Sequence, residues 1–181
     1  MVLDRTERAL RNQGHQVKTA DLYAENFQPA MLEQDFAQFE HKPMPAEIVA
    51  EQERVEWSDG LVFIFPVWWW SVPGMLKGWI DRVISYGWAW LDPSDPDSGL
   101  LRERPILVMA MAGASAEAFS KRKYDQALAT QLNVGTWGYC GFKDVTTRIF
   151  HDLHDGSPKS LGEGYLDEVS GLCGQAFSST K

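Results

Sequence analysis

The stretch from Leu61 to Trp90 constrains the fold of this chain most strongly. It begins with an apolar run, Leu61 to Phe65, rich in β-branched and aromatic side chains, which is typical of a strand buried on both faces of a sheet. Pro66 ends that run, and Pro73 can open a helix because the first helical residue needs no backbone N–H. An apolar helical face follows, made by Met75, Leu76, Trp79, Ile80, Val83 and Ile84. The stretch therefore predicts a strand, a short loop and a helix.

The loop between that strand and that helix carries three consecutive tryptophans, Trp68, Trp69 and Trp70. In open α/β sheets, ligands bind beyond the carboxyl ends of the strands, which is where this loop would lie. Large aromatic rings left beside water need a reason. Either the rings cover a flat ligand such as a flavin, or they pack into the core or a subunit interface, and the residue pattern leaves both open.

The rest of the chain alternates helices and strands. Helices are predicted over residues 1–13, 45–57 and 124–132 and in a last segment, where Ser160 and Glu163 have the spacing of a capping box. Further strands are predicted over Gln16–Leu22, Pro105–Met111 and Val145–Phe150. Such alternation indicates an α/β fold with a parallel sheet covered on both faces, and we expect residues 1–181 to form a single domain. The irregular segment 24–43 should place its scattered apolar side chains in the core, namely Phe27, Met31, Phe36 and Phe39.

Composition excludes several classes of function. The formal net charge of −8 disfavours a nucleic acid or an anionic membrane as the partner. Charged residues interrupt the apolar runs, so none should span a bilayer, and no secretory signal is visible at the N-terminus. The two cysteines, Cys140 and Cys173, make no disulfide framework, and we expect reduced thiols in a cytoplasmic protein.

Four segments together resemble a known family. They are DLYAENFQP (21–29), FPVWWWSVPGMLKGWIDRV (65–83), SYGWAW (85–90) and GTWGYCGF (135–142), and they are similar to segments of the flavodoxin-like NAD(P)H:quinone reductases, which include the drug-activity modulators and the ancillary reductases of potassium-efflux systems. The resemblance implies a flavodoxin-like three-layer sandwich and a homodimer with active sites at the subunit interface. It also implies a noncovalent flavin, FAD or in some members FMN, that passes hydride from NAD(P)H to a quinone in two-electron steps.

The resemblance also implies which residues form the site. Pro66, Val67, Trp68, Trp69 and Trp70 would line the flavin ring, with backbone N–H groups on its polar edge. Trp90 would close the substrate pocket of the neighbouring subunit and could stack on a quinone.

Two departures from the family pattern bear on activity. The family begins with a central strand and a phosphate-binding turn that this sequence lacks ahead of its first helix, so flavin affinity should be lower. The family's Thr-Thr-Gly-Gly loop is replaced by Met111, Ala112, Gly113 and Ala114, and a tyrosine five residues further on is Phe119. Gly113 and backbone N–H groups could still contact the ring.

Two alternatives therefore stay open: a reductase of azo or nitroaromatic compounds on the same flavin, or an impaired subunit that acts as a regulatory partner, for instance of a membrane transporter.

Other candidate residues give weaker signals. The H-x-x-H spacing of His151 and His154 lacks a carboxylate pattern, so we expect no metal and place His151 near the pocket rim. The basic run Lys121 to Lys123 either contacts a phosphate of NADPH or FAD or is an ordinary surface feature. Cys140 should be a buried thiol without a redox role.

Overall fold

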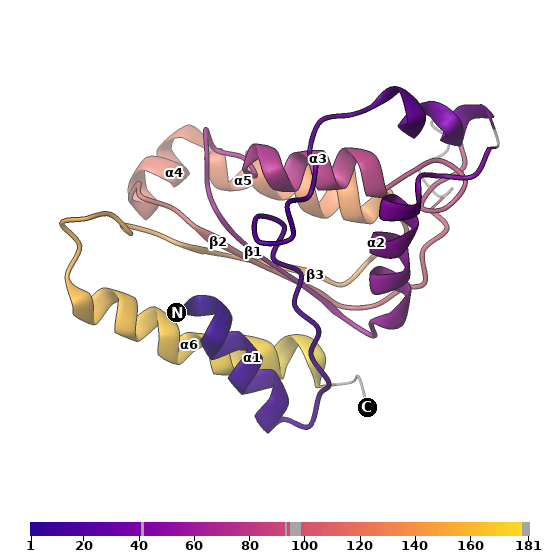
Figure 1. The fold of residues 1–181 in the computed structure, drawn as a ribbon. Helices are drawn as coiled ribbons and strands as arrows, with labels where there is room; N and C mark the ends of the chain where they lie inside the picture. Colours follow the sequence, from indigo (N-terminus) through magenta and orange to yellow (C-terminus); the bar gives the residue numbers. More distant parts are fainter. Residues whose placement is uncertain (41, 93, 95–98, 179–181) are drawn as a thin grey trace.

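The computed structural model describes residues 1–40, 42–92, 94 and 99–178 (Figure 1). Within them, three parallel strands form one sheet in the order β1–β2–β3: β1 is Leu61–Pro66, β2 is Ile106–Met111 and β3 is Val145–Phe150. Leu61 lies opposite Ile106, which lies opposite Val145, so the three strands start level and end level. Their carboxyl ends therefore meet along one edge of the sheet.

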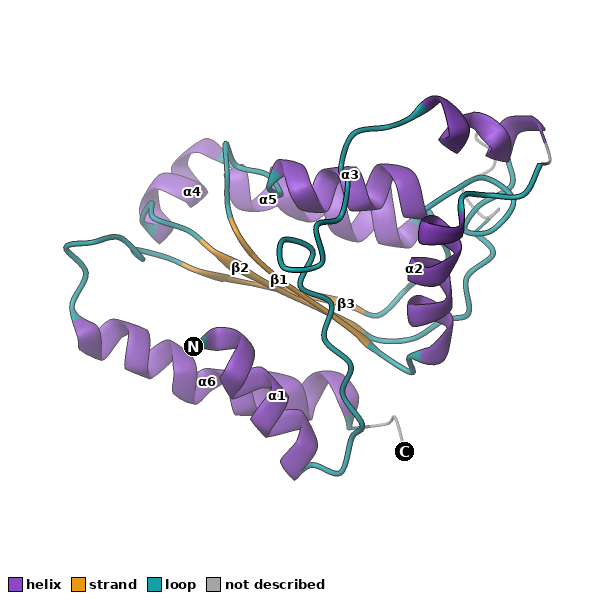
Figure 2. Cartoon of the chain, viewed as in Figure 1, coloured by secondary structure: helices purple, strands orange, loops and turns teal. Residues whose placement is uncertain are grey.

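Helices cover both faces of this sheet, as the sequence predicted (Figure 2). α3 (Gly74–Val83), α4 (Ala116–Arg122) and α5 (Tyr124–Ala129) lie over one face, and α1 (Val2–Asn12) and α6 (Lys159–Phe177) lie together over the other. α2 (Ala46–Trp57) packs beside α3. A 3₁₀ helix spans Glu33–Glu40, and a π-helix, Thr130–Gly138, continues α5. The architecture is a three-layer α/β sandwich.

The core has two parts, one on each face, because side chains alternate along β2. Ile106, Val108 and Ala110 pack with the helices α3 and α5, whereas Leu107 and Met109 pack with α1 and α6. Both sets of β2 side chains are buried. β1 differs from the expectation of burial on both faces, because most of its residues are only half-buried. It is one of the two edge strands of the described sheet, so one long side of it lacks a neighbouring strand.

The strand predicted over Gln16–Leu22 is absent, and that prediction was wrong. The segment has no ladder partner among the described residues. Its side chains bind elsewhere instead: the Thr19 hydroxyl donates to Glu7 on α1, and the Lys18 ammonium lies 4.0 Å from the centre of the Trp57 ring. Apolar alternation alone does not make a strand when no neighbouring backbone accepts its hydrogen bonds.

Segment 24–43 is held against the body by a buried ion pair and by Phe27, which packs against the core as predicted, whereas Met31 is 41% exposed. Phe36 and Phe39 are more than half exposed. The fully buried guanidinium of Arg82 on α3 donates two hydrogen bonds to the fully buried Asp35, from Nε to Oδ2 at 2.7 Å and from Nη2 to Oδ1 at 3.0 Å. Its Nη1 donates to the carbonyl of Gln28 at 2.6 Å. A single cation on α3 therefore fixes both ends of residues 28–35.

The same segment touches the backbone of α3. A Cβ atom added to Gly78 would lie 2.1 Å from the carbonyl oxygen of Pro29, far inside any permitted contact. This is why a glycine stands in the middle of α3 despite its low helix propensity. We call this joint, made by Gly78, Pro29, Arg82 and Asp35, the α3 seam.

Two smaller expectations also differ from the structure. The prediction of a capping box was wrong, because Ser160 and Glu163 lie inside α6, whose N-cap residue is Pro158. Residues 130–132, predicted as the end of an α-helix, belong to the π-helix. No helix in the described ranges is both long enough and apolar enough to cross a bilayer.

Candidate functional site

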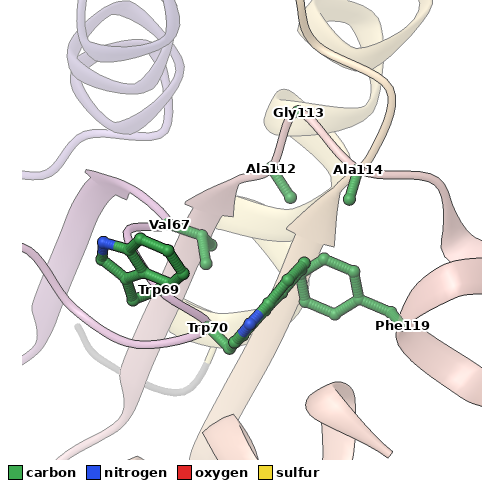
Figure 3. Close-up of a pocket in the computed structure, with 7 residues that line it drawn as sticks. All are labelled: Val67, Trp69, Trp70, Ala112, Gly113, Ala114 and Phe119. Carbon is green, nitrogen blue, oxygen red and sulfur yellow. The ribbon is translucent and has the colours of Figure 1, made fainter. Parts of the chain in front are cut away.

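A cavity of about 170 Å³ opens at the carboxyl ends of β1 and β2 (Figure 3). Two loops and the start of one helix form it: the loop after β1, the loop after β2, and α4. The residues that line it are Val67, Trp69, Trp70, Ala112, Gly113, Ala114 and Phe119. Pockets that enclose a whole small ligand usually hold about 300–1,000 Å³. The cavity is therefore smaller than a pocket that encloses a whole small ligand.

The loop after β1 is a strained two-residue hairpin. Trp68 and Ser71 exchange two backbone hydrogen bonds, each 3.0 Å from nitrogen to oxygen. The two residues between them, Trp69 and Trp70, have positive φ angles of 48° and 64°. Positive φ at both central positions is the type I′ pattern, which normally selects Asn and Gly. Bulky residues in such conformations cluster at functional sites, so this strain favours a role for the rings.

The two rings of that turn have different surroundings. Trp70 stacks on Tyr124 of α5 with ring centroids 3.8 Å apart and meets the edge of Phe119 at 5.5 Å. Trp69 is 90% exposed and stands at the mouth of the cavity (Figure 3). Trp70 is therefore a fixed wall of the site, whereas Trp69 is free to cover whatever enters it.

Apart from the indole N–H groups of Trp69 and Trp70, the polar groups at the cavity belong to the backbone. The N–H groups of Trp69, Trp70, Gly113 and Ala114 have no hydrogen-bond partner in the described part of the chain. Among the residues that the structure describes, no charged side chain lines the cavity. An apolar slot with unpaired N–H donors at its edge fits a flat ring system whose polar atoms lie along its rim. The residues present thus fit the isoalloxazine ring of a flavin.

The structure brings seven of the nine residues predicted for the cofactor site around this cavity. The other two do not line it: Pro66 is the exposed last residue of β1, and Trp68 is 61% exposed. Trp90, predicted to act on the neighbouring subunit, packs against Tyr86 and Tyr139. Its Nε1 donates to the carbonyl of Ile84 at 3.4 Å.

Sequence reasoning missed Tyr124, which supports the cavity from behind Trp70. It was assigned only to a helix, and its contact with Trp70 depends on how α5 lies over the sheet. Ser115 helps to place this region, because its hydroxyl accepts a hydrogen bond from the Ala118 N–H and caps α4. Lys123, with a φ angle of 58°, then joins α4 to α5 at a sharp bend.

Other candidate residues lie outside the cavity lining. The run Lys121 to Lys123 is exposed, and within the described residues none of its three cations forms an ion pair. Cys140 and Cys173 are buried free thiols, and burial raises the pKa of Cys140 to about 12 and that of Cys173 to about 11. Neither thiol is a ready nucleophile.

Comparisons with known proteins agree with this fold. The family described as "Flavodoxin-like fold" (Flavodoxin_2) matches residues 1–170. The human "Ribosyldihydronicotinamide dehydrogenase [quinone]" is 32% identical over 160 residues, which cover 77% of this chain and 69% of that protein. An "Uncharacterized NAD(P)H oxidoreductase" from Haemophilus influenzae is 28% identical over 84% of this chain and 76% of its own length.

A solved structure gives the same result. The NAD(P)H:quinone oxidoreductase from Methanothermobacter marburgensis superposes with a TM-score of 0.84 at 27% identity, covering 95% of this chain and 86% of that one. The chain therefore belongs to the flavodoxin-like family that includes these NAD(P)H and ribosyldihydronicotinamide quinone dehydrogenases.

Proposed function

We propose that this chain is a flavin-dependent NAD(P)H:quinone oxidoreductase that reduces quinones by two electrons. The observation that carries the proposal is the cavity at the ends of β1 and β2, with its apolar lining and its unpaired N–H groups. The names of the relatives support the same reaction class. FAD is the expected cofactor, with FMN as the alternative, and NAD(P)H is the co-substrate.

The chain's own residues bind and orient, because a bound flavin would supply the hydride chemistry. Trp70 and Phe119 would hold one side of a bound ring system in place, and Trp69 would shield it from water. The N–H groups of Gly113 and Ala114 would donate to its polar edge. Backbone donors thus take the place of the threonine hydroxyls that the family has in this loop.

We further propose that the working form is a homodimer. Four aromatic rings that do not line the cavity form a row. The ring of Phe36 contacts that of Phe39, and Phe39 stacks on Tyr86 with ring centroids 6.0 Å apart. Tyr86 then meets the ring of Trp90 with centroids 5.2 Å apart. Phe36 and Phe39 are 52% and 53% exposed. A second copy would cover these rings, and Trp90 would help complete the partner's partly open cavity. Sedimentation of the wild type and of Phe39→Ser tests this proposal. We expect a dimeric wild type and a weaker dimer in the variant, and a monomeric wild type would contradict the proposal.

The first experiment is flavin binding. The purified chain is incubated with excess FAD or FMN and desalted, and its visible absorption spectrum is recorded. Retained flavin, followed by oxidation of NAD(P)H with a quinone, is the expected result. Ala114→Phe should abolish retention by filling the cavity, whereas Val134→Phe, at a residue that is 67% exposed and does not line the cavity, should not.

The outcomes separate the alternatives. A chain that stays colourless and oxidises no NAD(P)H with any quinone refutes the proposal and leaves the regulatory role. A chain that binds flavin but prefers azo or nitroaromatic acceptors in a substrate panel keeps the cofactor and changes the substrate.

A further inference from the structure

The strained turn of the tryptophan loop needs support from outside the loop. Trp69 and Trp70 have φ angles of 48° and 64°, and bulky residues keep such conformations only where surrounding contacts compensate for the strain. The Trp69 ring is 90% exposed, so it can compensate for little of that strain. The backbone hydrogen bonds between Trp68 and Ser71 close the turn, but they would close an unstrained two-residue turn as well. The compensation must therefore come from contacts of the Trp70 ring and of the Ser71 side chain.

Tyr124 holds the Trp70 ring in place. It is the first residue of α5, and its ring stacks on that of Trp70 with centroids 3.8 Å apart and planes at 10°. Phe119 meets the edge of both rings, with centroids 5.5 Å from Trp70 and 5.9 Å from Tyr124 (Figure 3 shows Trp70 beside Phe119). Tyr124 is half-buried and does not line the cavity. A nearly parallel stack of this kind fixes both the position and the plane of the indole.

Gln131 holds the residue that follows the turn. The Ser71 hydroxyl donates a hydrogen bond to Gln131 Oε1 at 2.8 Å. Gln131 is the second residue of the π-helix, and its carbonyl accepts a hydrogen bond from the Thr136 hydroxyl at 2.9 Å, which fixes the backbone there. π-helical turns are rare and occur frequently at functional sites. One continuous helical segment, 124–138, therefore contacts the turn at two points.

We propose that Tyr124 and Gln131 are positioning residues, which hold the tryptophan turn in the conformation that binds flavin. We call their two contacts, Tyr124 with Trp70 and Gln131 with Ser71, the turn clamp. The inference rests on the proposed function and adds to it two residues that touch no ligand. The unpaired N–H groups of Trp69 and Trp70 belong to the turn, so relaxation to negative φ would redirect these donors together with the rings. The clamp thus prepares the site before a ligand arrives.

A site that is prepared before binding has a kinetic signature. If the turn is relaxed in part of the flavin-free molecules, only the remainder can bind, and the apparent dissociation constant rises as that remainder shrinks. The association rate constant then falls by the same factor. The dissociation rate constant stays unchanged, because the bound complex keeps its contacts. Loss of a direct ligand contact has a different signature, a faster dissociation.

The test is stopped-flow binding of FAD and of FMN, followed by quenching of flavin fluorescence. Tyr124→Leu removes the stacked ring, and we expect its association rate constant to fall about 3- to 10-fold while its dissociation rate constant stays within about twofold of the wild type. Tyr124→Phe keeps the stack and loses only a hydrogen bond of 3.4 Å from Arg122, so both rate constants should stay within about twofold. Trp69→Asn removes a side chain that lines the cavity and should mainly speed dissociation.

Gln131 supplies a second pair of variants, which should fold because its side chain is exposed. Gln131→Met keeps the length of the side chain and removes the acceptor of the Ser71 hydroxyl, so association should slow about 2- to 5-fold. Gln131→Glu keeps an acceptor at this position and should match the wild type.

The control for a merely structural loss is Tyr165→Leu. Tyr165 is a half-buried tyrosine on α6, and its ring packs on Phe150 with centroids 4.9 Å apart, on the opposite face of the sheet from α5. Its substitution should lower the urea midpoint about as much as Tyr124→Leu does, without changing either rate constant for flavin.

The outcomes distinguish this inference from the proposed function. If the wild type binds flavin and both Tyr124→Leu and Gln131→Met associate with it at the wild-type rate, the inference is overturned and the proposed function stands. If these variants instead dissociate faster, or if Tyr165→Leu slows association equally, the clamp is not what prepares the site and the inference also fails. If the wild type binds neither FAD nor FMN, both proposals fall.

Discussion

Substituting Trp69 by asparagine should stabilise the protein while weakening its binding site. Trp69 has a φ angle of 48°, and the left-handed conformation costs an ordinary L-residue roughly 1–2 kcal/mol. Asparagine adopts it readily at this turn position. The indole is 90% exposed, so truncation forfeits only about 0.5 kcal/mol of burial at about 25 cal/mol per Å². We therefore expect a net gain of about 1 kcal/mol in the free energy of unfolding.

Two assays check this expectation. Thermal unfolding of the flavin-free chain should show a rise in Tm of about 2–4 °C. Flavin titration should show a dissociation constant raised about 2- to 10-fold, because an aromatic contact contributes about 0.5–1.5 kcal/mol beyond its buried area. The control is Trp68→Asn at the neighbouring residue, which is 61% exposed, has no positive φ and does not line the cavity. Trp68→Asn should raise neither the Tm of the flavin-free chain nor the dissociation constant for flavin.

A clear loss of stability in Trp69→Asn would refute the reasoning, because it would show that the strained turn is held by contacts of the indole. An unchanged flavin affinity would show that the exposed ring does not cover the ligand.

Three further predictions concern stability and reactivity. Asp35→Ala should lower the free energy of unfolding, measured in urea, by about 3–5 kcal/mol, because it leaves the fully buried guanidinium of Arg82 without its buried partner. Glu47→Ala removes a half-exposed partner of the same cation and should cost less than about 1 kcal/mol. Equal losses in the two variants would contradict the difference in burial. The hydrogen bonds from Arg148 lower the pKa of Glu168 below its usual 4.5, so the carboxylate stabilises the fold above that pH, and the contribution is lost as the pH falls through the lowered value. Glu168→Gln should therefore be less stable than the wild type at pH 7, and the difference should vanish in acid; a difference that persists would exclude ionisation as its cause. Cys140, whose pKa burial raises to about 12, should not react with a thiol reagent at pH 8 until the chain unfolds, and rapid labelling of the native protein would contradict its burial.

Strands β2 and β3 and the central strand–loop–helix were predictable because their signals are local. Short apolar runs bounded by turn residues determine these strands, and a proline marks the start of α3 within one residue. The strand expected over Gln16–Leu22 failed because a strand also needs a neighbour. The prediction of an α-helix over residues 130–132 also failed, because these residues belong to a π-helix. Within it, a Cβ atom on Gly138 would lie 2.7 Å from the carbonyl oxygen of Asn133, and no sequence pattern reveals this contact.

The candidate site was predictable to a different degree. The loops after β1 and β2 could be placed at one edge of the sheet from the topology of parallel strands, and the family resemblance supplied the residues. Tyr124 could not be assigned a role, because its contact with Trp70 depends on helix packing. The strain at Trp69 and Trp70 was equally hidden, since nothing in the letters Trp-Trp indicates a left-handed turn.

The α3 seam has a consequence for the order of events in folding. Asp35 and Arg82 are separated by 47 positions, so their contact closes a long loop, and we expect it to form after the local structure of α3 and the neighbouring strands. Interactions made after the rate-limiting step hardly affect the folding rate, so weakening the seam should leave the folding arm of a chevron plot in place and speed unfolding. Segment 24–43 would then be the first part of the chain to detach under stress, and the lifetime of the native protein against proteases would depend on this one buried cation.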